Sequence, residues 1–276
     1  MSVFLDFFEQ ELFPYVDEHY RTLPYRVFSG HSFGGLFALN AFFSRPEMYR
    51  AVISISPVLN WDEDLPLRQA KRFLSDRSEV KATLFVAMAN EEEGQPKPNY
   101  LDRFEEILKG TQAKDFNWEV KRITDESHNS VVLRAQYWGL KKIFGDWSPP
   151  RDAETGAFIG GIDGLKKHYE VLSERFGFPI IPAELQVNAI GYQSLFADDL
   201  ATAIKIFRYN LSLYPESPNV YDSLAEALAK AGKSEEALIN YTKAVETAER
   251  VGDPRLKIFK ANRNLFVKEH RGSDPQ

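Results

Sequence analysis

The chain has 276 residues, of which 43% are hydrophobic and 27% charged, with a formal net charge of −6 and no cysteine. This length allows one large domain or two of ordinary size, and an acidic balance without a lysine or arginine cluster argues against nucleic acid as the main partner. The missing cysteines exclude disulfides, thiolate metal sites and cysteine nucleophiles. No apolar run reaches the ~18 residues of a membrane span. We expect a globular protein with no cofactor, no metal and no membrane or nucleic-acid partner.

The N-terminal segment, residues 2–20, carries apolar side chains at three- and four-residue spacing, which predicts an amphipathic helix. Pro14 lies inside this segment and is expected to kink the helix or restart it. The first six residues have no basic region and already include Asp6, which is not typical of a signal peptide. The default location on this basis is the cytoplasm.

The most informative motif is Gly-His-Ser-Phe-Gly-Gly at 30–35, between a strand-like segment at 25–29 and an apolar helix at 36–43. Strand, Gly-x-Ser-x-Gly and helix, in that order, form the context of a nucleophile elbow, where the serine hydroxyl projects from the sheet edge. Gly30 and Gly34 are expected to leave room for neighbouring backbone, and Ser32 is the predicted nucleophile. The alternative is a glycine turn that holds a serine by chance.

Beyond the elbow, strand-like and helical segments alternate as far as residue 144. The run at 83–88 is almost continuously apolar, as in a parallel strand that is covered on both faces. This alternation predicts an α/β domain with a mostly parallel sheet. The expected elements are strands at 51–56, 83–88 and 118–123, helices at 67–74, 100–108 and 131–144, and a polar loop at 58–66.

The alternation stops at Trp147-Ser148-Pro149-Pro150, and a glycine-rich stretch follows at 151–164. Only helical patterns come after it. We therefore expect a hydrolase domain at 1–147, a linker at 148–162 and a helical domain at 163–276.

The C-terminal part repeats itself with a period of 34 residues. That period, and its small and aromatic positions, resemble the tetratricopeptide repeat, a helix–turn–helix unit. A small residue at 237 would let two helices approach, and the aromatic residue at 241 would fill the gap beside it. Helices at 163–176 and 254–269 are expected to cap the two repeats, although an unrelated pair of helical hairpins is the alternative. The aligned positions are Val187, Ile190, Gly191, Ala203, Phe207 and Pro215 with Tyr221, Leu224, Ala225, Ala237, Tyr241 and Glu249.

A serine hydroxyl needs an adjacent base, usually a histidine oriented by a carboxylate. In elbow hydrolases the acid and then the histidine follow the serine on loops at the carboxyl ends of later strands. His128 follows the strand at 118–123 and is the predicted base. Of the glutamates after the strand at 83–88, Glu92 is the first choice as the acid and Glu91 the second, with Asp125 third. A catalytic dyad of serine and histidine, without an acid, is the remaining alternative.

The oxyanion of an acyl-transfer reaction needs about two aligned hydrogen-bond donors. The backbone N–H of Phe33, which directly follows the nucleophile, is expected to supply the first. The second normally comes from a loop upstream of the elbow strand, where this chain has only 24 residues, enough for one helix. The source of the second donor is therefore not identified by the sequence.

Several segments of the first 145 residues form a specific combination. They are 11–15, 20–22, Gly30-His31-Ser32-Phe33-Gly34-Gly35-Leu36-Phe37-Ala38, Ser54-Ile55-Ser56-Pro57 with Trp61-Asp62, and Ser127-His128-Asn129-Ser130-Val131. With these segments, the first 145 residues resemble the putative-esterase family of α/β hydrolases, which includes esterase D-like proteins and the siderophore (enterobactin and salmochelin) esterases. The resemblance implies Ser32 as nucleophile, His128 as base and ester cleavage, through an acyl-enzyme, as the reaction. We also expect His31 and Trp61 to contact the substrate.

The chain departs from that family because several strands that precede the elbow in its members have no counterpart here. The expected fold is thus an α/β-hydrolase core lacking its N-terminal strands, either as a fragment of a longer enzyme or as a natural truncation, followed by an all-α tetratricopeptide-like domain. An open edge on the elbow strand would invite pairing with another chain, which makes a homo-oligomer a candidate.

Two functions remain open on this evidence. The first is a serine esterase that acts on a small-molecule ester. The second is a catalytically impaired hydrolase-like scaffold whose helical repeats bind a peptide or protein partner.

Overall fold

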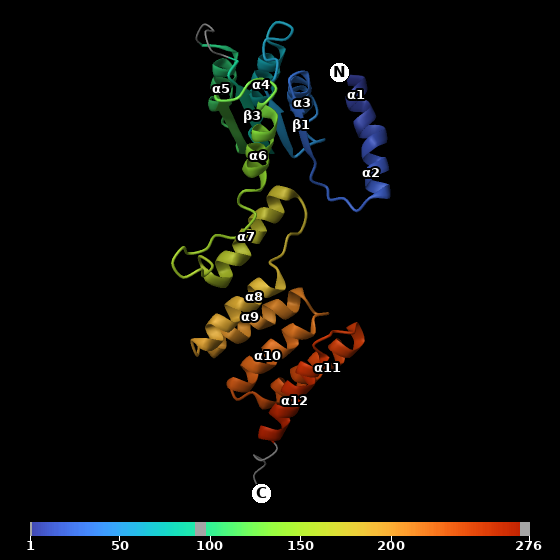
Figure 1. Cartoon of the computed structure of the whole chain (residues 1–276), viewed down its shortest axis with the longest axis vertical. Coiled ribbons are helices and arrows are strands. Elements are labelled where there is room, and N and C mark those ends of the chain that lie inside the picture. The colour runs from blue at the N-terminus through green and yellow to red at the C-terminus, as the bar shows by residue number, and fades with distance from the viewer. Residues whose placement is uncertain (1, 92–97, 271–276) are drawn as a thin grey trace. The chain divides into compact units, whose positions relative to one another are not determined.

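The computed structural model describes residues 2–91 and 98–270, and Figure 1 shows the order of its elements. The chain divides into two compact units. The first comprises Met1–Ser148 with Leu172–Phe178, and the second Pro149–Val171 with Pro179–Gln276. Within the described ranges, no helix is both long and apolar enough to span a bilayer.

A parallel sheet of four strands forms the centre of the first unit. Its strands are β1 (Val27–His31), β2 (Ala51–Ile55), β3 (Glu79–Ala89) and β4 (Lys114–Ile123), in the spatial order β1-β2-β3-β4. All three strand pairs are parallel, so the four carboxyl ends lie at one edge of the sheet. The α/β class with a parallel sheet, predicted from the alternation of segments, is confirmed.

Helices cover both faces of this sheet. Alternate residues of β1 show the two faces, because Phe28 packs against Phe37 of α3 (Phe33–Ser44) while the hydroxyl of Ser29 donates to Gln136 of α6 (Val131–Phe144). Helix α3 also packs on α4 (Leu65–Ser75), and α4 on α5 (Tyr100–Lys109). The buried core between α3, α4, α5 and the sheet includes Leu39, Phe42, Phe73, Leu84 and Phe104.

The N-terminal segment is helical, as predicted, but its interruption lies before Pro14. Helix α1 (Ser2–Phe7) passes into a π-helical turn, η1 (Phe8–Leu12), and then into α2 (Phe13–His19). Pro14 occupies the first turn of α2, directly after the π-helical turn. Phe8 packs against Phe28 of β1, which places this segment beside the elbow strand.

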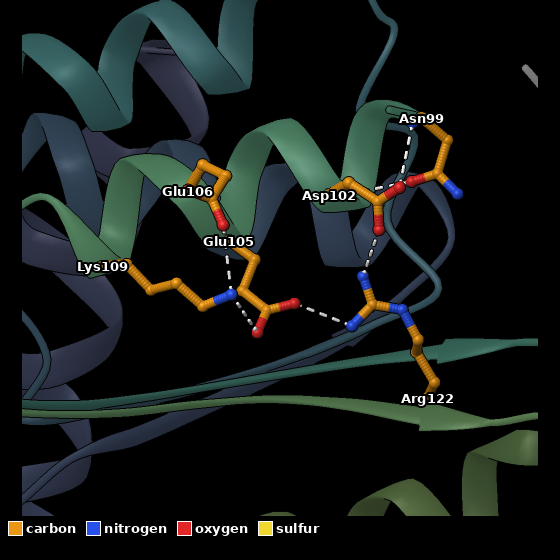
Figure 2. Close-up of polar contacts among 6 residues, drawn as sticks. All are labelled: Asn99, Asp102, Glu105, Glu106, Lys109 and Arg122. Atoms are coloured by element: carbon orange, nitrogen blue, oxygen red, sulfur yellow. Dashed lines mark hydrogen bonds and ion pairs between the residues drawn. The ribbon is translucent and has the colours of Figure 1, made fainter. Parts of the chain in front are cut away.

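An ion-pair network fastens α5 to β4 (Figure 2). The guanidinium of Arg122, near the end of β4, donates at 2.7 Å to both Asp102 and Glu105 of α5. The hydrogen bond from Arg122 lowers the pKa of the Glu105 carboxyl. Asn99 and Asp102 form a capping box at the start of the same helix. The network therefore holds together two elements that border the loops after β3 and β4.

The second unit consists mainly of helices that pack in chain order. Helix α8 (Glu184–Phe196) packs on α9 (Leu200–Leu213), and α10 (Pro218–Lys230) packs on both α9 and α11 (Ser234–Val251). Helix α12 (Leu256–His270) packs on α11, while α7 (Gly161–Phe176) has residues in both units. The stretch expected to be a linker contains an isolated antiparallel bridge between Arg151 and Phe158.

The predicted small and aromatic positions meet between the helices of the second unit. A Cβ on Gly191 of α8 would lie 2.4 Å from the ring of Phe207 of α9, so any larger residue would clash. Ala225, Ala237 and Tyr241 lie in the same buried cluster as Phe207. Close approach of these helices therefore depends on residues that recur 34 positions apart.

Replacement of Asp222 by asparagine is expected to stabilise the second unit by about 2 kcal/mol at pH 8 and by much less at pH 4.5. Burial raises the pKa of the Asp222 carboxyl to about 6, while the hydrogen bond from Asn262 acts in the opposite direction. Because this folded-state pKa lies above the unfolded one, stability present below about pH 4 is lost as the pH rises through 6. The asparagine variant has no charge to bury.

Urea unfolding followed by far-UV circular dichroism measures this effect. All four tryptophans lie at or before residue 147, so their fluorescence reports the first unit and serves as an internal reference. An identical pH dependence in both proteins would show that Asp222 does not titrate as described.

Candidate active site

Ser32 lies in a sharp turn between the end of β1 and the start of α3. Its φ of 59° and ψ of −119° lie in a region that non-glycine residues rarely adopt, as expected for the serine of a nucleophile elbow. Its backbone N–H donates to the carbonyl of Ile55 at the end of β2 at 2.9 Å. The strained turn is thereby anchored to the neighbouring strand.

Two glycines, Gly30 and Gly35, leave the space that this turn needs, whereas the sequence predicted Gly30 and Gly34. A Cβ on Gly30 would lie 2.0 Å from the carbonyl oxygen of Gly34, and a Cβ on Gly35 would lie 2.8 Å from that of Ile55. Gly34 itself faces open space, so the expectation that it makes room for backbone is wrong. The crowding falls at Gly35 because that residue, one position further into α3, faces the end of β2.

The loop after β4 returns across the sheet and brings His128 beside the elbow. Nε2 of His31 lies 2.8 Å from the backbone carbonyl oxygen of His128, and the two imidazole rings are 4.5 Å apart between centroids. This return follows from the position of α6, which begins at Val131 and packs on β2 and β3. The chain must therefore leave β4 toward β1 to start that helix.

The acidic neighbour of His128 is Glu91. Its Oε1 lies 3.0 Å from Nδ1 of His128, and both side chains are about one-third exposed. Glu92, the first choice from the sequence, lies outside the described residues. Asp125 points elsewhere, because its carboxylate accepts a hydrogen bond of 2.5 Å from Arg134, which lowers the pKa of the Asp125 carboxyl.

The loops that carry Glu91 and His128 are joined directly to each other. The backbone N–H of Asn90 donates to the carbonyl of Glu126 at 2.9 Å. The Glu126 carboxylate in turn accepts from the hydroxyl of Ser130 and from Arg134, and these bonds lower its pKa. The backbone on both sides of His128 is thus held by hydrogen bonds.

Two exposed aromatic rings meet at the start of α3. Phe33 is 58% and Trp61 45% exposed, and their rings meet edge to face at 5.3 Å between centroids. Trp61 precedes three consecutive residues with positive φ, at 62–64, so a tight left-handed turn holds it there. The pair forms an exposed apolar surface at the residue that follows Ser32.

The structure brings together most of the residues that the sequence singled out. Ser32, His31, Phe33 and Trp61 lie around the elbow, and the backbone of His128 contacts His31. Within residues 2–91 and 98–270 there is no hydrogen bond between the Ser32 hydroxyl and the His128 imidazole. Such bonds often tighten only when substrate is bound.

Sequence reasoning did not foresee the link between His31 and the carbonyl of His128. The sequence feature that could have indicated this link is the alternation of side chains along a strand, which puts residues 29 and 31 on the same face of β1. That face is the one that α6 covers, as the contact between Ser29 and Gln136 shows.

A family model and several curated relatives each match part of the chain. Residues 1–132 match the model of the family described as "Putative esterase". A siderophore triacetylfusarinine C esterase of Aspergillus fumigatus is 33% identical over 171 residues, which cover 53% of this chain and 59% of that protein. The ferri-bacillibactin esterase BesA of Bacillus subtilis is 32% identical over 73 residues, or 26% of this chain and 25% of that enzyme. Both matches span less than two thirds of the relative's length.

Solved structures extend the comparison to the fold. An IroE-like serine hydrolase from Shewanella oneidensis has a TM-score of 0.54 at 25% identity, covering 71% of this chain and 61% of its own. An uncharacterised protein from Capnocytophaga ochracea has a TM-score of 0.68 at 19% identity, covering 94% of this chain and 75% of its own, and is similar in fold alone. Together, the comparisons support an α/β-hydrolase-like fold.

Proposed function

We propose, from the match of residues 1–132 to the Esterase family, that this chain is a serine hydrolase that cleaves carboxylic esters through an acyl-enzyme at Ser32. The observation that supports this most strongly is the contact between the elbow and the loop of His128, across three strand positions of a parallel sheet. Nucleophile, base and acid then share the carboxyl edge of the sheet, in the chain order Ser, acid, His of elbow hydrolases.

In this proposal His128 acts as the general base and Glu91 orients it. If the proton of neutral His128 is on Nδ1, which lies 3.0 Å from Oε1 of Glu91, Nε2 is unprotonated and accepts the proton of the Ser32 hydroxyl. The serine oxygen bonds to the ester carbon, and the carbonyl electron pair moves onto oxygen. The backbone N–H of Phe33, in the first turn of α3, has no helical acceptor and donates to this oxyanion.

Collapse of the tetrahedral intermediate completes the first half of the reaction. The bond between carbon and the alcohol oxygen breaks, and His128 returns the proton to the leaving alcohol. Water then attacks the acyl-enzyme with His128 again as base, which releases the carboxylic acid and restores Ser32. No cofactor or metal enters these steps.

For the substrate we propose a small-molecule ester of the class that the names of the curated relatives describe, a siderophore ester. His31 and Trp61 were expected to contact it, and the Phe33–Trp61 pair offers an apolar surface beside the nucleophile. Hydrolysis of p-nitrophenyl acetate by the purified chain, and its loss when Ser32 is replaced, tests the reaction class. The alternative of an impaired scaffold is not favoured by the family match.

Replacement of Glu91 by glutamine is expected to lower kcat by about 10²- to 10⁴-fold, because the amide no longer stabilises the imidazolium that forms at His128. Replacement of Glu92 by glutamine is the matched control, since the two residues are neighbours of identical chemistry. Steady-state kinetics on p-nitrophenyl acetate measures both. A large loss in the Glu92 variant with little change in the Glu91 variant would reverse the assignment of the acid.

For the second unit we propose two tetratricopeptide-like repeats, α8–α9 and α10–α11, with a peptide or protein as partner. Side chains one period apart contact each other, since Tyr192 donates to Glu226 at 2.8 Å and Asn219 to Glu184 at 2.9 Å. Arg250 likewise pairs with Glu216. Contacts at separations of 34 and 35 residues are what stacked copies of one helical hairpin produce.

A further inference from the structure

The contact between His31 and the backbone of His128 joins two parts of the site that are 97 residues apart in the chain. His31 ends β1, one residue before the nucleophile, and His128 lies in the loop before α6. Both residues are half-buried, so the bond between them is partly shielded from water. The contact links the elbow after β1 to the loop after β4, although these two strands lie at opposite edges of the sheet.

The chemistry of this contact fixes the role of each atom. A carbonyl oxygen only accepts hydrogen bonds, so Nε2 of His31 must carry the proton and donate it. The neutral Nε2–H tautomer and the imidazolium both meet this requirement. Because Nε2 is already occupied in this way, it is not available to bind a substrate.

We propose that His31 is a positioning residue for His128, which rests on the proposed function of His128 as base. Its Nε2–H holds the backbone at position 128 against the elbow, so that the imidazole of His128 stays within reach of the Ser32 hydroxyl. A second bond on the same face of β1, from Ser29 to Gln136 at 2.5 Å, fixes α6 behind the loop. His31 therefore acts on the rate of the chemical step and not on substrate affinity.

Kinetics of His31→Leu tests this role against the substrate-binding role. Leucine removes the donor, and we expect kcat on p-nitrophenyl acetate to fall by about 10- to 100-fold with KM changed less than about twofold. His31→Gln, whose amide N–H can reach the same carbonyl, is expected to recover most of kcat. A rise in KM at unchanged kcat, or no recovery in His31→Gln, would overturn the proposal.

A matched control is available in the same unit. Nδ1 of His19 lies 2.8 Å from the carbonyl oxygen of Tyr15, the same type of bond within a single helix. His19→Leu is therefore expected to leave kcat and KM unchanged. Should His31→Leu fail to fold, His31→Gln and His31→Glu form a second pair of equal length, of which only glutamine donates at pH 8.

Hydrogen–deuterium exchange of the 124–130 backbone separates this proposal from the proposed function. We expect faster exchange there in His31→Leu or His31→Glu than in the wild type and His31→Gln. Unchanged exchange in all variants would show that His31 does not hold the loop, whether or not the chain hydrolyses esters. A wild-type chain without esterase activity would refute the proposed function. The exchange result would still show whether His31 holds the backbone at position 128.

Discussion

Replacement of Ser32 by alanine is expected to lower kcat/KM for p-nitrophenyl acetate by a factor on the order of 10⁴ to 10⁶. Alanine removes only the hydroxyl, and its Cβ meets the same backbone strain at φ 59° as that of serine. The fold should therefore survive while the atom that bonds to the ester carbon is lost. Any remaining turnover would come from water attack on an ester held at the oxyanion site.

Ser44→Ala is the matched control for this substitution. Ser44 ends α3, the helix that Ser32 precedes, and its hydroxyl donates to the carbonyl of Asn40. We expect its kinetics to equal those of the wild type. Ser32→Ala kinetics that also equal those of the wild type would remove Ser32 from the mechanism.

Replacement of His128 by alanine is expected to lower kcat by about 10³- to 10⁶-fold, because the Ser32 hydroxyl then has no base to take its proton. The loss should exceed that of Glu91→Gln, since an unoriented histidine can still accept a proton and a missing one cannot. Free imidazole added to His128→Ala is expected to restore part of the rate. Steady-state kinetics with and without imidazole measures both effects.

His168→Ala in α7 is the control for general effects of losing a histidine. It is expected to retain wild-type kcat and to show no response to imidazole. If His128→Ala hydrolyses the ester as fast as His168→Ala does, another group must act as base.

Local patterns predicted the elements of this fold well, because each depends on neighbouring residues. The apolar run at 83–88 lies inside β3, and the helix expected at 131–144 is α6 with the same bounds. The π-helical turn at Phe8–Leu12 was not predicted, since apolar spacing hardly differs between a π-turn and an α-turn over five residues.

The details of the site depend on contacts between distant segments, which one sequence does not reveal. Glu91 and Glu92 are equivalent as neighbours in a row of glutamates, and the proximity of Glu91 to His128 depends on two loops that Asn90 and Glu126 join. Gly34 and Gly35 are likewise equivalent until the end of β2 is placed against one of them. The chain order of the proposed acid and base could be predicted because parallel strands share one carboxyl edge.

Labelling with a fluorophosphonate, followed by mass spectrometry of the adduct, tests most directly whether Ser32 and His128 act together. The account predicts one adduct per chain, on Ser32, and a labelling rate at least about 10³-fold lower in His128→Ala. An adduct on a different residue, or equal rates in the wild type and His128→Ala, would contradict it.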